Sequence, residues 1–181
     1  MRVLLDTCVI YPTVMREMLL GVAGAGAFVP LWSERIIGEW WHAAAKLGPE
    51  AQAQADGEAV LMAARWPGAC VSYAPSLEAR LWLPDPADTH VLAAAIAGSA
   101  DGIVTLNARD FPRGVLAEEG LWRADPDGFL HGIWCAQPGL VAQVAGEVLD
   151  TARRLSKGEW EMRALLKKAR LPRLAKALGA G

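Results

Sequence analysis

Short apolar segments alternate with segments of helical periodicity along the first two thirds of the chain. The apolar segments predict buried strands at residues 3–5, 27–31, 70–73, 102–106 and 121–122. The segments between them predict helices at residues 12–22, 34–47, 50–65 and 85–97, with helical turns at 115–119. Strands that alternate with helices indicate an α/β domain, a central parallel sheet flanked by helices.

Helix signals alone occupy the chain from residue 127 onward. Residues 139–155 carry leucines and valines at helical spacing, and a basic helix that restarts at Gly158 is interrupted by Pro172. The predicted layout is therefore an α/β domain over residues 1–126, followed by a helical C-terminal appendage over residues 127–181.

Composition supports a folded protein without a targeting segment. The chain has 181 residues, of which 53% are hydrophobic, enough to bury a core. Asp6 stands where a signal peptide would continue apolar, and the longest apolar stretch, residues 91–97, is too short to span a bilayer. Three cysteines without metal or redox spacing indicate reduced thiols. We expect a cytoplasmic protein with no membrane partner.

Charge is unevenly distributed along the chain. Residues 151–181 hold nine Lys/Arg against Glu159 and Glu161, a net charge of +7, so the net charge of −2 leaves −9 for residues 1–150. Three interpretations of the basic segment are open. It can contact the phosphates of a nucleic acid, form a solvated face on packed helices, or dock an acidic partner protein.

Four acids converge on one place in the predicted fold. Asp6 and Asp110 each follow a predicted strand, at the edge where parallel sheets bind ligands. Glu39 borders the apolar stripe of its helix formed by Ile36, Trp40, Ala43 and Leu47. Asp88 shares a helix face with Val91, Leu92 and Ala95. Each acid alone has a structural explanation, and Asp85 is expected to cap the helix that Pro86 opens. Together they indicate a site for Mg²⁺ or Mn²⁺.

Other kinds of site lack support. His42, His90 and His131 are scattered, no Ser–His–Asp motif is visible, and the glycine-rich segment at residues 21–26 has no lysine.

At these acids the sequence resembles the PIN-domain family of metal-dependent nucleases. The likeness covers residues 1–126. It rests on the start Val-Leu-Leu-Asp-Thr at residues 3–7, on Glu39, and above all on residues 85–112, which contain Asp-Pro-Ala-Asp-Thr-His-Val-Leu-Ala-Ala-Ala and Arg-Asp-Phe-Pro. By resemblance, Asp6, Glu39, Asp88 and Asp110 are the catalytic acids that hold Mg²⁺ or Mn²⁺.

The resemblance also assigns supporting roles. We expect three residues to support the metal-binding acids without binding the metal themselves: Thr105, Asn107 and Asp85. Two positions depart from the family pattern: many members have an acid where Asn107 stands and a small polar residue where Cys8 stands. Possible phosphate contacts are Arg35, Arg65 and Arg109.

The function that the resemblance implies is a divalent-metal-dependent endoribonuclease, the VapC-like toxin of a toxin–antitoxin pair. Such toxins are homodimers that cleave RNA and are held in check by a cognate antitoxin protein. Two alternatives are open. One is a catalytically weak PIN fold that binds RNA or a partner, and the other is a nuclease directed at DNA or at a nucleic-acid structure.

Overall fold

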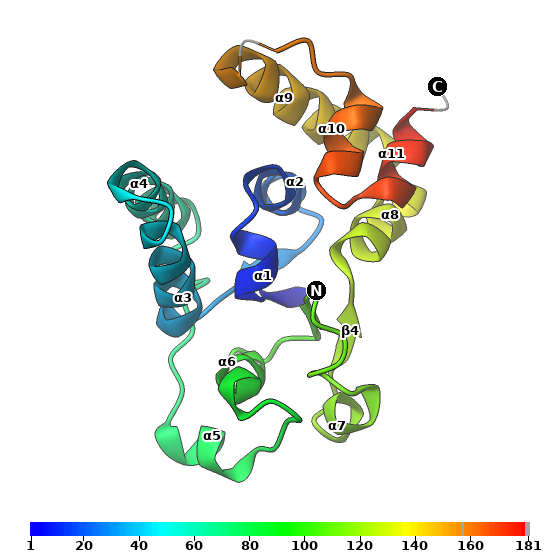
Figure 1. Cartoon of the computed structure of the whole chain (residues 1–181). Helices are drawn as coiled ribbons and strands as arrows, with labels where there is room; N and C mark the ends of the chain where they lie inside the picture. Colours follow the sequence, from blue (N-terminus) through cyan, green and yellow to red (C-terminus); the bar gives the residue numbers. More distant parts are fainter. Residues whose placement is uncertain (157, 180–181) are drawn as a thin grey trace. The chain divides into compact units, whose positions relative to one another are not determined.

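The computed structural model describes residues 1–156 and 158–179 (Figure 1). These residues form two compact units. The first, here called the sheet unit, comprises residues 1–11 and 29–123. The second, here called the helical unit, comprises residues 12–28 and the described residues from 124 onward.

A four-stranded parallel sheet forms the centre of the sheet unit. Its strands are β1 (Arg2–Leu5), β2 (Val29–Leu31), β3 (Gly102–Val104) and β4 (Trp122–Ala124), in the order β2-β1-β3-β4. In the central strand β1, Val3, Leu4 and Leu5 are completely buried. A continuous apolar strand of this kind is typical of a parallel sheet that is covered on both faces. The predicted α/β fold with a parallel sheet is confirmed.

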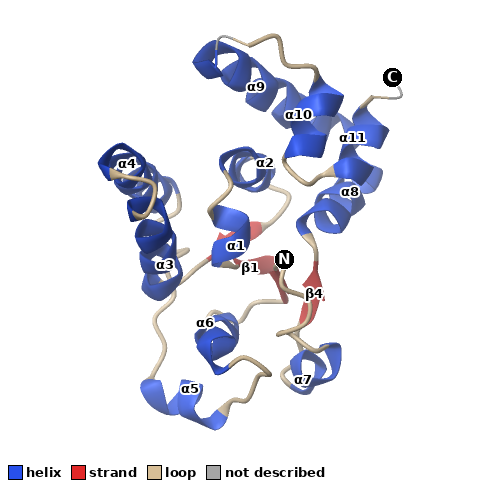
Figure 2. Cartoon of the chain, viewed as in Figure 1, coloured by secondary structure: helices blue, strands red, loops and turns tan. Residues whose placement is uncertain are grey.

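The sheet unit also contains seven helical segments (Figure 2). They are α1 (Thr7–Ile10), α3 (Glu34–Ala45), α4 (Pro49–Arg65), α5 (Pro75–Arg80), the 3-10 helix η1 (Pro86–Asp88), α6 (Thr89–Ala97) and α7 (Arg113–Glu118). Ser33 caps α3 by accepting a hydrogen bond from the Ile36 amide, as its residue type predicts. Helix α6 packs against β1 and is buried from Thr89 to Ala95.

A close approach of β4 to β3 requires a glycine. An added Cβ on Gly102 would fall 2.2 Å from Cδ2 of the Trp122 ring. The missing side chain lets the indole lie directly over β3.

The helical unit contains α2 (Thr13–Gly24), α8 (Pro126–Ala136), α9 (Pro138–Ser156), α10 (Met162–Lys168) and α11 (Pro172–Leu178). Helix α2 packs against α9, where a Cβ on Gly21 would come within 2.5 Å of Val144 Cγ1. Helix α11 packs against α8 and α10.

A buried carboxylate fixes the start of α11. Asp127, on α8, is 5% exposed, and its two oxygens accept hydrogen bonds from the amides of Arg173 (2.8 Å) and Leu174 (3.0 Å). The N-cap residue Leu171 has no side chain that could do this, so α8 supplies the cap for α11.

Several local expectations were wrong. Residues 70–73 form no strand: Cys70 makes one isolated bridge to Trp32, and the segment is exposed or half-buried until Pro75 starts α5. Leu47, expected in the apolar stripe of α3, is 70% exposed because the helix ends at Ala45. Helices α1 and α5 were not expected, whereas α8 lies in the stretch from residue 127 onward that was expected to be helical. The helix predicted at residues 12–22 exists as α2, but it groups with the C-terminal helices. The division between residues 126 and 127 stays a prediction.

Two expectations from composition can be compared with the structure. Among the described residues, no helix combines the length and the apolar character that a membrane span needs. Cys8, Cys70 and Cys135 are all free thiols.

Removing the Asp127 cap should destabilise the protein. We expect Asp127→Ala to lower the free energy of unfolding by ~2 kcal/mol, because the amides of Arg173 and Leu174 lose a charged acceptor. Urea denaturation followed by circular dichroism measures this, with Asp150→Ala, an exposed position on α9, as the control. Equal stability of the two variants would contradict the capping role.

Candidate metal centre

Asp6 lies at the carboxyl end of β1, beside the end of β3. The two strands pair in parallel with Leu5 opposite Val104, so the next residues, Asp6 and Thr105, meet at the same sheet edge. Thr105 Oγ1 donates to Asp6 Oδ2 at 2.7 Å, and the Cys8 thiol donates to the same oxygen at 3.1 Å. Asp6 is 6% exposed. The hydroxyl and the thiol therefore fix the orientation of a buried carboxylate, and the supporting role of Thr105 at a metal site stays a prediction.

Cys8 belongs to this arrangement as a thiol, not as a thiolate. Burial and the negative charge of Asp6 raise its pKa to about 12. The Leu106 amide donates to its sulfur at 3.2 Å, which ties the chain after β3 to α1. The departure at Cys8 thus keeps a hydrogen-bond donor toward Asp6.

Three other acids form a compact group. Asp85, Asp88 and Asp110 each offer a carboxylate oxygen, and these oxygens all lie within 4.8 Å of one another. Asp85 and Asp88 come from the two ends of η1, and Asp110 from the turn after β3. Asp85 also caps η1 by accepting from the Ala87 amide at 2.9 Å, so it has both the expected capping role and a place in the acidic group.

The acidic group fits a small divalent cation. An octahedral Mg²⁺ site holds oxygens at about 2.1 Å, which puts opposite oxygens about 4.2 Å apart. The carboxylate oxygens all lie within 4.8 Å of one another, near this upper limit for ligands of one ion, and hard oxygen donors are what Mg²⁺ and Mn²⁺ select. Asn107 Nδ2 donates to Asp88 Oδ2 at 3.0 Å, so the amide orients Asp88 rather than adding charge.

Electrostatic repulsion is visible at Asp88. Burial, followed by the negative charges of Asp6, Asp85 and Asp110, raises the pKa of Asp88 to about 6. The effect of Asp6 shows that it lies in the electrostatic neighbourhood of the group, although it is not one of the three closely spaced acids.

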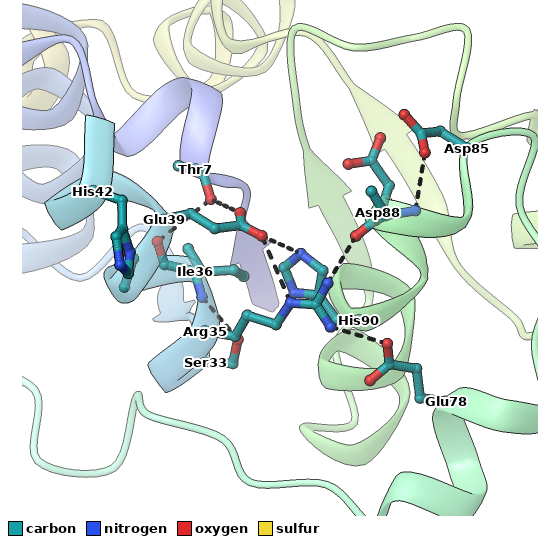
Figure 3. Close-up of polar contacts among 12 residues, drawn as sticks. Thr7, Ser33, Arg35, Ile36, Glu39, His42, Glu78, Asp85, Asp88 and His90 are labelled. Atoms are coloured by element: carbon teal, nitrogen blue, oxygen red, sulfur yellow. Dashed lines mark hydrogen bonds and ion pairs between the residues drawn. The ribbon is translucent and has the colours of Figure 1, made fainter. Parts of the chain in front are cut away.

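Glu39 is positioned differently from the other predicted acids (Figure 3). Its Oε2 accepts from Thr7 Oγ1 at 2.7 Å, and its Oε1 lies 2.8 Å from His90 Nε2 and 3.7 Å from Arg35 Nε. Burial would raise the pKa of Glu39, but the contacts with His90 and Thr7 and the charge of Arg35 outweigh it, so that this pKa is lowered. Among the described residues, Glu39 is therefore held by positive and donor groups and is outside the three-acid group.

His90 is a buried side chain whose part in the site the sequence did not reveal. Its imidazole is 1% exposed, and the contact of Nε2 with Glu39 is short but lacks the alignment of a regular hydrogen bond. The other ring nitrogen, Nδ1, has no partner among the described residues. The position of His90 two residues after Asp88 in the helix carried the only signal, since a lone histidine more often fills a core.

The three predicted phosphate contacts are in different surroundings. Arg35 lies beside the acids: its guanidinium pairs with Glu78 at 3.1 Å and donates to the Ala87 carbonyl at 3.4 Å (Figure 3). Arg65 stacks on the Trp66 ring, with 4.7 Å from its Cζ to the ring centroid. Arg109 is exposed in the turn before Asp110. Their roles toward a substrate stay predictions.

Comparison with known families agrees with this geometry. A family profile described as the PIN domain matches residues 2–109, which include Asp6, Glu39, Asp85 and Asp88. The chain belongs to the PIN-domain family. Searches of curated proteins and of solved structures found no match.

PIN domains are generally metal-dependent nucleases. The three-acid group of this PIN domain could hold such a metal ion. The assignment of Asp6, Glu39, Asp88 and Asp110 as metal-binding catalytic acids stays a prediction.

The ionised Asp88 carboxylate should destabilise the metal-free protein. Its pKa of about 6 in the folded state exceeds the ordinary 3.8, so its ionised form destabilises the fold above pH 6. This cost disappears as the pH falls from about 6 toward 3.8, because the carboxyl is then protonated in the folded protein. We therefore expect Asp88→Asn to raise the melting temperature at pH 8 in EDTA, and to raise it less as the pH approaches 4.

Thermal melts measure this, and Asp56→Asn, at an exposed position on α4, is the matched control. A lower melting temperature for Asp88→Asn at pH 8 would contradict the repulsion.

Proposed function

We propose that this PIN domain is a divalent-metal-dependent endoribonuclease and the toxin of a toxin–antitoxin pair. The observation that carries the proposal is the group of carboxylate oxygens from Asp85, Asp88 and Asp110. Asp6 is near enough for its negative charge to contribute to the raised pKa of Asp88. These residues would hold Mg²⁺ or Mn²⁺. When bound, the ion would polarise the scissile phosphate, lower the pKa of an attacking water and stabilise the departing oxygen.

The protein side chains supply orientation and charge. Thr105 and Cys8 hold Asp6 in one orientation, and Asn107 does the same for Asp88. Such contacts are worth about 10 to 100-fold in metal affinity or activity at metal sites. Arg35 is half-exposed, and its guanidinium contacts the Ala87 carbonyl between Asp85 and Asp88, a suitable place for a cation that binds a substrate phosphate.

Glu39 has one of two roles in this proposal. By the family resemblance it is a ligand, which would require it to turn from His90 toward the acidic group. In the arrangement described here, its contacts with Thr7, His90 and Arg35 make it the residue that positions Arg35. Both roles predict weaker cleavage on substitution, but only the first predicts weaker metal binding.

RNA as substrate, the cognate antitoxin and the homodimer rest on the resemblance to VapC-like toxins, and the cytoplasmic location rests on the composition of the chain. Phosphodiester chemistry at the acids does not distinguish RNA from DNA. The 2′-hydroxyl would have to be recognised by residues beyond the acidic group.

A second candidate is a PIN fold that binds RNA or a partner without cutting it. The uncharged Asn107, at a position where many relatives have an acid, favours this candidate. Calorimetric titration with Mn²⁺ distinguishes the two candidates. A nuclease should bind Mn²⁺ at a site that Asp110→Asn abolishes, whereas a binding module without a working centre should show no such site.

Cleavage should depend on the acidic group and on pH. We expect purified protein to cut RNA only with Mg²⁺ or Mn²⁺, and Asp88→Asn or Asp110→Asn to reduce the rate by about 100-fold or more. Since a proton on Asp88 competes with the ion, activity at limiting metal should fall as the pH drops through about 6. Gel assays with RNA and DNA of the same sequence measure this. Undiminished cutting by both variants would refute the site, and equal cutting of DNA would refute the RNA preference.

Expression in cells tests the toxin role. Induced wild-type protein should arrest bacterial growth, Asp88→Asn should not, and Asp56→Asn should act as wild type. Growth that continues after induction of active, soluble protein would contradict the toxin assignment while leaving the nuclease assignment intact.

A further inference from the structure

The cationic side chains of the last two helices have not been used by the site described above. Exposed lysines and arginines lie on α10, on α11 and in the connection between them, here called the cationic face: Arg163, Lys167, Lys168, Arg170, Arg173 and Lys176. Over residues 161–179 these six cations oppose one acid, Glu161, which leaves +5. None of the six takes part in an ion pair found among the described residues.

The cationic face is built on a packed base. Leu165, Leu166, Leu171 and Leu174 are 3% exposed or less, and they form the opposite, buried side of the two helices. Asp127 fixes the start of α11 through two backbone hydrogen bonds. Trp160, just before α10, is also held, because Arg153 Nε donates to its carbonyl and Lys168 lies over its ring. The charges are therefore carried by folded, packed helices.

Spacing brings cations together on single helix faces. Arg163 and Lys167 are four residues apart on α10, and Arg173 and Lys176 are three apart on α11, so each pair shares a face. The Arg163 side chain also lies next to Gly179, beyond the end of α11. Like charges this close repel one another, and the repulsion is relieved when a polyanion binds.

The composition of the face favours phosphate over protein as its partner. Cores of protein interfaces are rich in large aromatic and apolar anchors and are depleted of lysine. On α10 and α11, the exposed residues other than the cations are Ala164 and Pro172, which offer no large apolar anchor. Lysine and arginine without such anchors are typical of contacts with a nucleic-acid backbone.

We propose that the cationic face binds the phosphate backbone of RNA without regard to base sequence. The choice of RNA over other polyanions rests on the proposed function, but the binding itself does not require the metal centre. Two contacts at Arg163 and Lys167 would add about 1.4 to the slope of log affinity against log salt for a single strand, and about tenfold or more to affinity at 0.1 M salt.

The test compares Arg163→Gln/Lys167→Gln with a control that loses the same charge elsewhere, Lys46→Gln/Arg113→Gln, both of whose positions are exposed. All proteins carry Asp88→Asn and are kept in EDTA, so that the RNA stays intact. Fluorescence anisotropy follows a labelled 20-nucleotide RNA of mixed sequence from 50 to 300 mM salt, and thermal melts check that each variant is folded.

The proposal expects the α10 variant to lose about tenfold in affinity and to show the flatter salt slope, while the control changes little. Equal losses in both variants would overturn it in favour of a general charge effect. A second outcome would overturn it in favour of an acidic protein partner. In that outcome the α10 variant binds RNA as the wild type does, but it loses the binding of labelled poly-glutamate that the wild type shows. Because the assay measures binding and not cleavage, these outcomes can be interpreted even if the protein is not a nuclease.

Discussion

Repulsion between carboxylates that the backbone holds close together is the interaction on which the candidate site depends. Parallel pairing of β1 with β3 brings Asp6 to the sheet edge beside Thr105, and η1 and the turn after β3 bring Asp88, Asp85 and Asp110 within 4.8 Å of one another. At Asp88, burial and then the negative charges of Asp6, Asp85 and Asp110 raise the pKa to about 6. A divalent cation would convert this repulsion into attraction, which is the physical reason for proposing a metal-dependent nuclease.

The acids divide into two electrostatic environments. Glu39 faces Thr7, His90 and Arg35, and its pKa is lowered, whereas Asp88 faces other acids, and its pKa is raised. Opposite shifts in neighbouring carboxyl groups often accompany different chemical roles. In this arrangement Arg35 links the two environments, because its guanidinium contacts both Glu39 and the carbonyl of Ala87, next to Asp88.

Hydrophobic periodicity was sufficient to predict the sheet, because its two central strands carry buried apolar residues in succession, Val3 to Leu5 in β1 and Ile103 and Val104 in β3. It was also sufficient to bring Asp88 and Asp110 together, since strand ends and helix starts meet at one edge of a parallel sheet. Residues 70–73 were mistaken for a strand because a short apolar stretch does not reveal how few of its residues form hydrogen bonds with a neighbouring strand. The orientation of Glu39 toward His90, the place of Asp85 in the acidic group and the capping of α11 by Asp127 all depend on side-chain geometry between distant segments. Periodicity along the chain contains no information on such contacts.

The central claim is that Asp85, Asp88 and Asp110 hold a divalent cation. It is tested most directly by anomalous diffraction from crystals soaked in Mn²⁺ at pH 8. The account predicts an anomalous peak within about 2.3 Å of carboxylate oxygens from these residues, and the absence of that peak from Asp88→Asn crystals. A manganese peak elsewhere in the molecule, or none at a concentration that supports RNA cleavage, would contradict it.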